Sequence, residues 1–262
     1  MMGIEPCSTS SLDVGEALAG TATVASRWLL LEVRRAWGRD VEETVLPAPA
    51  AALAGAFDGR VQLIRRPERR TEPALAFVAE SLEQGGTLVE AAPGNRTVDG
   101  SVFLVCCHGR RDPCCARLGT PVFEALRTRL PERSVWQSSH LGGHRFAANV
   151  LVLPAGILLG RVRPEDAMRV VADVAAGRIP LDLYRGRTVH PPEAQAADTA
   201  VRAHLGLTRI DAVSVVTVKD GRVRLATPSG EIDAAVEAHP GPPRCESCGK
   251  DPLPSTRYDV RW

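Results

Sequence analysis

The stretch from Ser101 to Val150 holds an unusual concentration of metal-binding side chains. It opens with an apolar run and continues as Val102-Phe103-Leu104-Val105-Cys106-Cys107-His108-Gly109-Arg110-Arg111-Asp112-Pro113-Cys114-Cys115. Further along it contains Val135-Trp136-Gln137-Ser138-Ser139-His140-Leu141-Gly142-Gly143-His144. Four of the seven cysteines and three of the six histidines lie in this stretch. Thiolates and imidazoles are ligands of zinc, copper and iron, so the pattern predicts a metal site.

The spacing of apolar residues predicts an α/β domain with a thioredoxin-like core. We expect strands over 101–106 and 134–138 with a helix over 120–130 between them, which makes a right-handed parallel unit. Pro154-Ala155-Gly156 is typical of a turn between two further strands, and Pro164 opens a helix. The order βαβ-ββα is that of a thioredoxin-like fold. Both ligand-rich loops then follow the carboxyl ends of adjacent parallel strands, so they should meet.

Three segments are expected along the chain. We expect residues 1–97 to form an N-terminal α/β half in which no site is visible. This half is either a degenerate thioredoxin-like copy or an extension of the same sheet. Residues 98–190 are the thioredoxin-like domain. Residues 191–262 predict a small C-terminal extension with a helix, a hairpin and a tail that contains Cys245-Glu246-Ser247-Cys248. Pro240, Gly241, Pro242 and Pro243 indicate that this tail is irregular.

Composition argues against several classes of protein. The chain of 262 residues has a formal net charge of +1, without the basic excess of a nucleic-acid-binding protein. It has no apolar run of about 18 residues and no signal-peptide pattern, so we expect no membrane span and a cytoplasmic location. In that compartment cysteines are more often ligands or reactive thiols than disulfides. No Gly-x-Gly-x-x-Gly fingerprint indicates a bound nicotinamide or flavin.

The residues leave the kind of metal site open. Adjacent side chains on an extended segment point to opposite sides, so one cysteine of each pair should face the site. Gly142-Gly143 makes a helix unfavourable and predicts a tight loop that carries His140 and His144. Two thiolates and two imidazoles could hold one tetrahedral zinc ion or a two-iron cluster with mixed ligation.

The two motifs resemble those of the sucrase/ferredoxin-like family, which are thioredoxin-like [2Fe-2S] ferredoxins. The family pattern is Cys-x-His-x-x-Arg-Asp-x-x-Cys followed by His-x-Gly-Gly-His. The resemblance implies a [2Fe-2S] cluster with Cys₂His₂ ligation by Cys106, Cys115, His140 and His144. It also selects three residues around the cluster: His108, which would hydrogen-bond the loop or a sulfur, and Arg111 and Asp112, which would pair with each other.

The chain departs from the family pattern in its extra thiols. Cys107 and Cys114 lie beside the implied ligands and leave open whether Cys114 replaces Cys115. Cys245 and Cys248 form a possible second site, for zinc, which would need a further pair taken from Cys7 and Cys107 or Cys114.

The resemblance implies an electron carrier more than an enzyme with its own substrate, because the sequence shows no convincing pair of catalytic carboxylates for sugar hydrolysis. Its partner would be a protein such as a reductase or an oxidase. The oligomeric state is not indicated. Two other functions are compatible with the cysteines: a thiol–disulfide oxidoreductase and a zinc-stabilised interaction module.

Histidine ligation predicts that reduction of the cluster is coupled to proton uptake. An imidazole on oxidised iron can lose its outer proton, and reduction would restore that proton. We therefore expect the reduction potential to fall as pH rises between about pH 6 and pH 9. Redox titration at several pH values measures this, and a potential that does not change over that range would contradict proton coupling.

Overall fold

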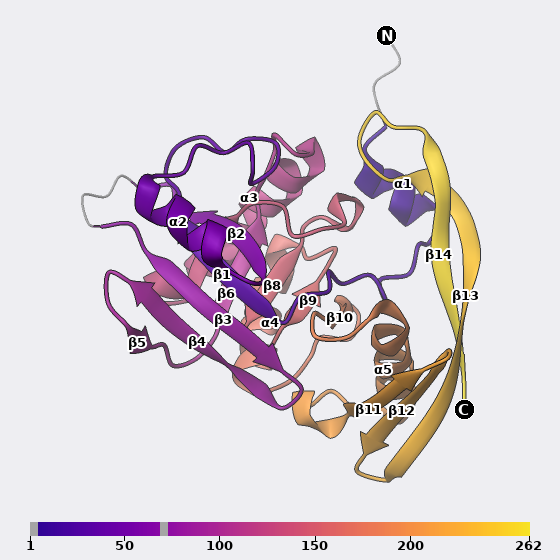
Figure 1. The fold of residues 1–262 in the computed structure, drawn as a ribbon. Coiled ribbons are helices and arrows are strands. Elements are labelled where there is room, and N and C mark those ends of the chain that lie inside the picture. The colour runs from indigo at the N-terminus through magenta and orange to yellow at the C-terminus, as the bar shows by residue number, and fades with distance from the viewer. Residues whose placement is uncertain (1–4, 69–72) are drawn as a thin grey trace.

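The structure is a computed structural model that describes residues 5–68 and 73–262. Residues 1–4 and 69–72, all within the expected N-terminal half, lie outside the described residues. The described strands form a ten-stranded sheet and a separate four-stranded sheet (Figure 1). Besides the elements named below, short 3₁₀ turns cover Glu132–Ser134, His144–Phe146, Pro164–Asp166 and Ile210–Ala212.

The central part of the chain has the expected thioredoxin-like arrangement. Its elements are β6 (Val102–Cys106), α3 (Pro113–Arg127), β7 (Val135–Ser138), β8 (Val150–Leu153), β9 (Ile157–Leu159) and α4 (Ala167–Ala175). β6 pairs parallel with β7 and antiparallel with β8, and β8 pairs antiparallel with β9. The strand order is therefore β9-β8-β6-β7, which confirms the fold class predicted from the sequence. A strand that was not expected, β10 (Tyr184–Arg187), extends the sheet beyond β9.

The N-terminal half repeats the same strand order. It contains β1 (Arg27–Glu32), α2 (Ala48–Ala56), β2 (Arg60–Arg65), β3 (Ala76–Leu82), β4 (Gly85–Ala92) and the short β5 (Arg96–Thr97). β1 pairs parallel with β2 and antiparallel with β3, and β3 pairs antiparallel with β4. β2 then joins β7 through only two residue pairs. This half is thus both a second copy of the strand order and an extension of one sheet.

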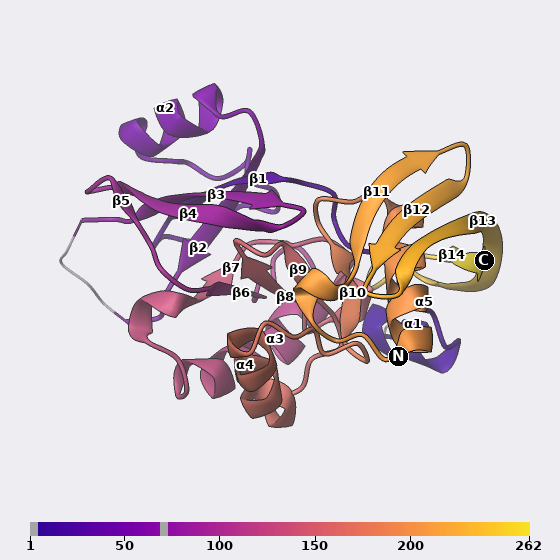
Figure 2. The same ribbon diagram turned by 90° about the horizontal axis from the view of Figure 1, so that it is seen from below.

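The two halves of the long sheet are stacked on each other. Trp28 and Phe77 of the first half share one buried core with Leu104 and Trp136 of the second, and the rings of Phe77 and Trp136 lie 5.8 Å apart. α2 covers the outer face of one half, while α3 and α4 cover the outer face of the other (Figure 2). The halves therefore bury their inner faces together, and this burial favours association because it removes apolar surface from water.

Helix α3 begins seven residues before the segment predicted as helical. Asp112 caps it by accepting a 2.9 Å hydrogen bond from the backbone N–H of Cys114, and Pro113 occupies the first turn. Pro121, near the start of the predicted segment, lies inside the helix. Cys114 and Cys115 are consequently on a helical turn and not on an extended segment, which corrects the sequence-based expectation for this pair.

The C-terminal extension is more regular than predicted. The expected helix and hairpin are α5 (Pro192–Leu205), β11 (Ser214–Lys219) and β12 (Arg222–Thr227). The tail, which we expected to be irregular, is a long hairpin of β13 (Gly230–Cys245) and β14 (Pro252–Arg261). Its prolines are accommodated because that part of β13 pairs with β14 alone and shifts register between Pro240 and Pro243.

The turn of this hairpin lies beside the N-terminal helix α1 (Cys7–Asp13), so segments far apart in the sequence meet there (Figure 1). Of the helices in the described residues, none has the length and apolarity needed to cross a membrane.

Where α3 contacts β6, Gly119 occupies a position that tolerates only glycine. A Cβ at Gly119 would overlap the backbone oxygen of Cys106. We expect Gly119→Ala to lower the free energy of unfolding by about 1–3 kcal/mol. The matched control is Gly55→Ala in α2, where a Cβ meets nothing within 4 Å; it should raise stability by about 0.5–1 kcal/mol. Denaturant titration measures both, and equal effects would refute the close contact.

Candidate metal centre

Three of the expected ligands come together at one end of the thioredoxin-like domain. Cys106 ends β6, Cys115 lies in the first turn of α3, and His140 follows β7. One donor atom from each lies within 4.8 Å of the others, and the Cys115 Sγ is 3.9 Å from His140 Nδ1. Both cysteines are buried, whereas His140 is half-buried. The parallel pairing of β6 with β7 brings the two loops to the same edge, as the sequence predicted.

Each pair of adjacent cysteines divides between two environments. Cys106 faces the gathered ligands, while Cys107 points into the core beneath α3. Cys115 lies with Cys106, while Cys114 lies with Cys7 and Cys248 in a separate group. The geometry thus places Cys115, and not Cys114, beside Cys106.

His144 is buried next to this group without a hydrogen bond that would explain its position. Its ring centroid lies 5.0 Å from that of His140, and its Nε2 lies 3.8 Å from a carboxylate oxygen of Asp112. Neither ring nitrogen makes a hydrogen bond of normal geometry within the described residues, although the backbone of Glu246 is close enough to raise the pKa of His144. Burial lowers the pKa of His144, partly offset by the nearby Asp112 carboxylate. A buried neutral imidazole with free nitrogens fits a metal ligand.

The loop between the two histidines has the backbone shape that its glycines suggested. Gly142 and Gly143 have φ values of +92° and +66°, a region that side chains disfavour. The fully buried Arg185 donates a 2.9 Å hydrogen bond to the carbonyl of Gly142, and a Cβ at Gly143 would overlap the guanidinium of Arg185. Arg185 also donates to Thr21. The sequence showed no mechanism for Arg185, and only the fold reveals that it supports the histidine loop.

His108 links the site to the N-terminal half. Its Nδ1 accepts a hydrogen bond of 3.2 Å from the backbone N–H of His140, so its Nε2 donates to the carbonyl of Gly38, 2.8 Å away. Burial lowers the pKa of His108, which favours this neutral form. Arg60 and Gln62 also reach across from β2 and donate to the carbonyl of His140. The half in which the sequence showed no site therefore holds the histidine loop in place.

The sequence predicted that Arg111 and Asp112 pair with each other, but in the structure they do not. Arg111 forms an ion pair of 2.6 Å with Asp40 of the N-terminal half. Asp112 is buried and accepts backbone hydrogen bonds of 2.9 Å from both Cys114 and Cys248. Burial by itself would raise the pKa of Asp112, but these N–H donors lower it to about 2. The two charged residues therefore fasten the cysteine loop to separate parts of the molecule.

The thiols of Cys106 and Cys115 have pKa values that shift in opposite directions. Cys115 donates a hydrogen bond that lowers the pKa of Cys106 well below its ordinary value, and the pKa of Cys115 is raised by the same interaction. The N-terminus of α3 adds positive potential at Cys115. Of the two thiols, Cys106 is therefore the one that loses its proton more readily.

Solvent reaches the site from its histidine side. A cavity of about 560 Å³ is bordered by His140, His144 and Glu246, and a second of about 380 Å³ is bordered by His108 and His140. The sulfur atoms lie deeper, with Cys106 and Cys115 at most 1% exposed. The imidazole edge is therefore the part of the site nearest to the surface.

Residues 18–186, which are more than half of the chain, match the family model described as sucrase/ferredoxin-like. The chain is a member of this family. The match covers both halves of the ten-stranded sheet and the four residues predicted as cluster ligands, whereas Cys245 and Cys248 lie beyond it.

The chain also resembles curated proteins, over a shorter part of its length. A protein from Debaryomyces hansenii named "Altered inheritance of mitochondria protein 32" is 35% identical over 95 residues, which is 32% of this chain and 35% of the relative. Its namesake from Clavispora lusitaniae is 33% identical over 96 residues, 34% of this chain and 35% of that relative. The chain thus spans about a third of the length of these relatives.

Two solved structures are also similar. The thioredoxin-like [2Fe-2S] ferredoxin from Aquifex aeolicus is 22% identical, with a TM-score of 0.32 over 36% of this chain and 97% of the ferredoxin. A cysteine-to-serine variant of the same ferredoxin gives 21% identity and a TM-score of 0.30 over 33% of this chain and 99% of the variant.

The hydrogen bonds of His108 predict that its ring nitrogens stabilise the site loop. His108→Phe keeps an aromatic ring beside Trp37, whose centroid lies 5.6 Å away, but leaves the His140 N–H and the Gly38 carbonyl unpaired. We expect a loss of about 1–3 kcal/mol in the free energy of unfolding. Denaturant unfolding measures it. Unchanged stability would mean that the ring acts only through packing.

Proposed function

We propose that this family member binds a [2Fe-2S] cluster through Cys106, Cys115, His140 and His144 and transfers electrons one at a time. The observation that carries the proposal is His144, whose two buried nitrogens have no hydrogen-bond partner in the described chain while they lie beside three gathered ligands. Two thiolates and two imidazoles are a ligand set known for two-iron clusters.

The positions of the donors support a cluster over a single zinc ion. A tetrahedral zinc ion with two sulfur and two nitrogen ligands holds all four donors within about 4 Å of one another. Here the donor atoms of Cys106, Cys115 and His140 lie within 4.8 Å of one another, but those of His144 lie outside their group. A larger, two-iron group accommodates the more distant histidine.

The residues around the site prepare it for electron transfer. Bound there, a [2Fe-2S] cluster supplies a reversible one-electron couple. The fold holds the two thiols in the interior and the two imidazoles toward solvent, and neutral imidazoles in place of two thiolates favour a higher potential. Arg185 and His108 fix the loop of the histidines by hydrogen bonds to Gly142 and His140. Proton coupling of the reduction stays a prediction from the histidine ligands.

The electron would enter and leave at the edge formed by His140. This edge is the closest to the surface, and the exposed Arg39 and Lys250 border the adjacent cavity. A protein partner with an acidic docking surface, such as a reductase or an oxidase, fits this charge. No substrate of the chain's own is part of the proposal, and a cytoplasmic location stays a prediction.

Thiol–disulfide exchange, the second function considered from the sequence, is less compatible with the burial of the thiols. Cys114 has the properties of a reactive thiol, because hydrogen bonds from Cys7 and then from Ser8 lower its pKa to about 5. Its side chain is nevertheless only 1% exposed, and a disulfide substrate must reach the attacking sulfur. Electron transfer needs no such direct contact.

The test is an ultraviolet–visible spectrum of protein purified without oxygen, with iron and sulfide assayed. We expect visible absorption that bleaches on reduction, with iron and sulfide in equal amounts. Cys106→Ser and Cys115→Ser should lose most of this absorption. In His140→Cys and His144→Cys, electron paramagnetic resonance should change, and the potential should fall toward that of all-cysteine clusters.

Cys107→Ser is the matched control, because Cys107 is equally buried but faces the opposite core. It should keep the visible spectrum. A colourless wild-type protein, or loss of absorption in Cys107→Ser to the same degree as in Cys106→Ser, would overturn the proposed ligand set.

A further inference from the structure

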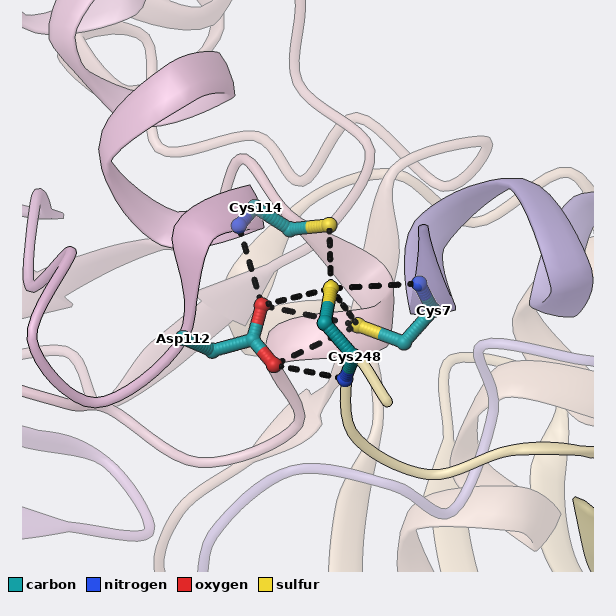
Figure 3. A group of neighbouring side chains, drawn as sticks. All are labelled: Cys7, Asp112, Cys114 and Cys248. Atoms are coloured by element: carbon teal, nitrogen blue, oxygen red, sulfur yellow. Dashed lines mark hydrogen bonds between the residues drawn. The ribbon is translucent and has the colours of Figure 1, made fainter. Parts of the chain in front are cut away.

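A second group of metal-binding side chains lies beside the proposed cluster site. Cys7 of α1, Cys114 of α3, Cys248 of the β13–β14 turn and the carboxylate of Asp112 each present a donor atom within 4.8 Å of the others (Figure 3). Cys7 and Cys248 are separated by 241 residues in the chain. From sequence we expected this site to include Cys245, but the sulfur of Cys245 falls outside the group.

We propose that these four residues form a second, mononuclear zinc site, Cys7-Asp112-Cys114-Cys248. The zinc site shares no ligand with the proposed [2Fe-2S] cluster, so the two proposals are independent of each other.

The distances between donors match the edges of one tetrahedron. The Cys248 Sγ lies 3.4 Å from the Cys114 Sγ and 3.7 Å from the Cys7 Sγ. An Asp112 oxygen lies 3.2 Å from the Cys248 Sγ and 3.6 Å from the Cys7 Sγ. Zinc–sulfur bonds of about 2.3 Å and zinc–oxygen bonds of about 2.0 Å at tetrahedral angles give edges of about 3.8 and 3.5 Å. The four donors therefore suit one ion.

The surroundings stabilise the anionic ligands as a metal site requires. The backbone N–H of Cys7 points at the Cys248 Sγ at 3.4 Å, and the Ser8 hydroxyl lies 3.3 Å from the Cys114 Sγ. Asp112 accepts from the N–H groups of Cys114 and Cys248. Donors of this kind orient ligands and offset their negative charge, and the N-terminus of α3 adds further positive potential.

The burial of the group favours a structural ion. Cys7, Asp112 and Cys114 are each at most 1% exposed, and Cys248 is half-buried. Four protein donors leave no open coordination position, which is the arrangement of structural zinc sites. Without an ion, only hydrogen-bond donors would offset the charge of a buried carboxylate packed against three thiols.

The site would fasten α1 and the β13–β14 turn over the cluster. Asp112 also lies 3.8 Å from His144, and Cys114 is adjacent to Cys115. Glu16, which follows α1, forms ion pairs of 2.9 Å with Arg145 of the histidine loop and with Arg244 of β13. Zinc would therefore hold α1 and the hairpin against the first turn of α3, so that solvent is kept from the sulfur side of the cluster.

The experiment uses the full chain purified without oxygen, with zinc, iron and sulfide measured together and zinc-edge X-ray absorption recorded. We expect one zinc ion per chain, with three sulfur neighbours at about 2.3 Å and one oxygen neighbour at about 2.0–2.2 Å. Cys248→Ser should lower the zinc content about tenfold or more while iron and sulfide persist. Loss of iron with retained zinc would instead indicate failure of the cluster proposal alone.

Cys245→Ser is the matched control, because Cys245 is buried against Cys7 and Cys114 but lies outside the donor group. It should retain zinc. Protein that contains no zinc, a Cys114–Cys248 disulfide found by mass spectrometry, or a zinc spectrum with four sulfur neighbours would overturn the proposal. If Cys248→Ser does not fold, the wild-type absorption spectrum decides, since it reports the ligands directly.

Discussion

The organisation of the site depends on the cap that Asp112 provides for α3. The carboxylate accepts the N–H of Cys114 and so starts the helix directly after the cysteine loop. A cap of this kind contributes about 1 kcal/mol, but its larger consequence is geometric. Neighbouring residues on a helix differ in direction by about 100°, so Cys114 and Cys115 face different groups. The same carboxylate then binds the N–H of Cys248 and draws the C-terminal hairpin to the helix.

The duplicated strand order explains how a small domain can carry so polar a site. Each half alone would leave one face of its sheet in water. Stacking of the halves buries those faces in a common core around Trp28, Phe77 and Trp136. The loops of the N-terminal half are thereby brought to the metal centre, where Gly38, Asp40 and Arg60 hold the residues that carry the ligands. The half without ligands thus supplies their support.

The C-terminal hairpin has a role that its amino-acid composition did not indicate. Proline-rich segments usually indicate irregular structure, and β13 contains Pro240, Pro242 and Pro243. Proline is acceptable there because the strand has one neighbour only, so half of its N–H groups would face solvent in any case. The resulting hairpin carries the turn with Cys248 back to α1.

The sequence by itself determined the βαβ-ββα order, the two ligand-rich loops and their meeting at one edge of the sheet. These features are local: they follow from apolar periodicity, from glycine and proline positions and from the parallel pairing of two consecutive strands. The supports of the site were decided by tertiary structure, because His108 binds Gly38 and Arg185 binds Gly142 across long stretches of chain. The same holds for the gathering of Cys7, Cys114 and Cys248. No local pattern specifies which distant side chains share a buried space, since that depends on how complete faces pack together.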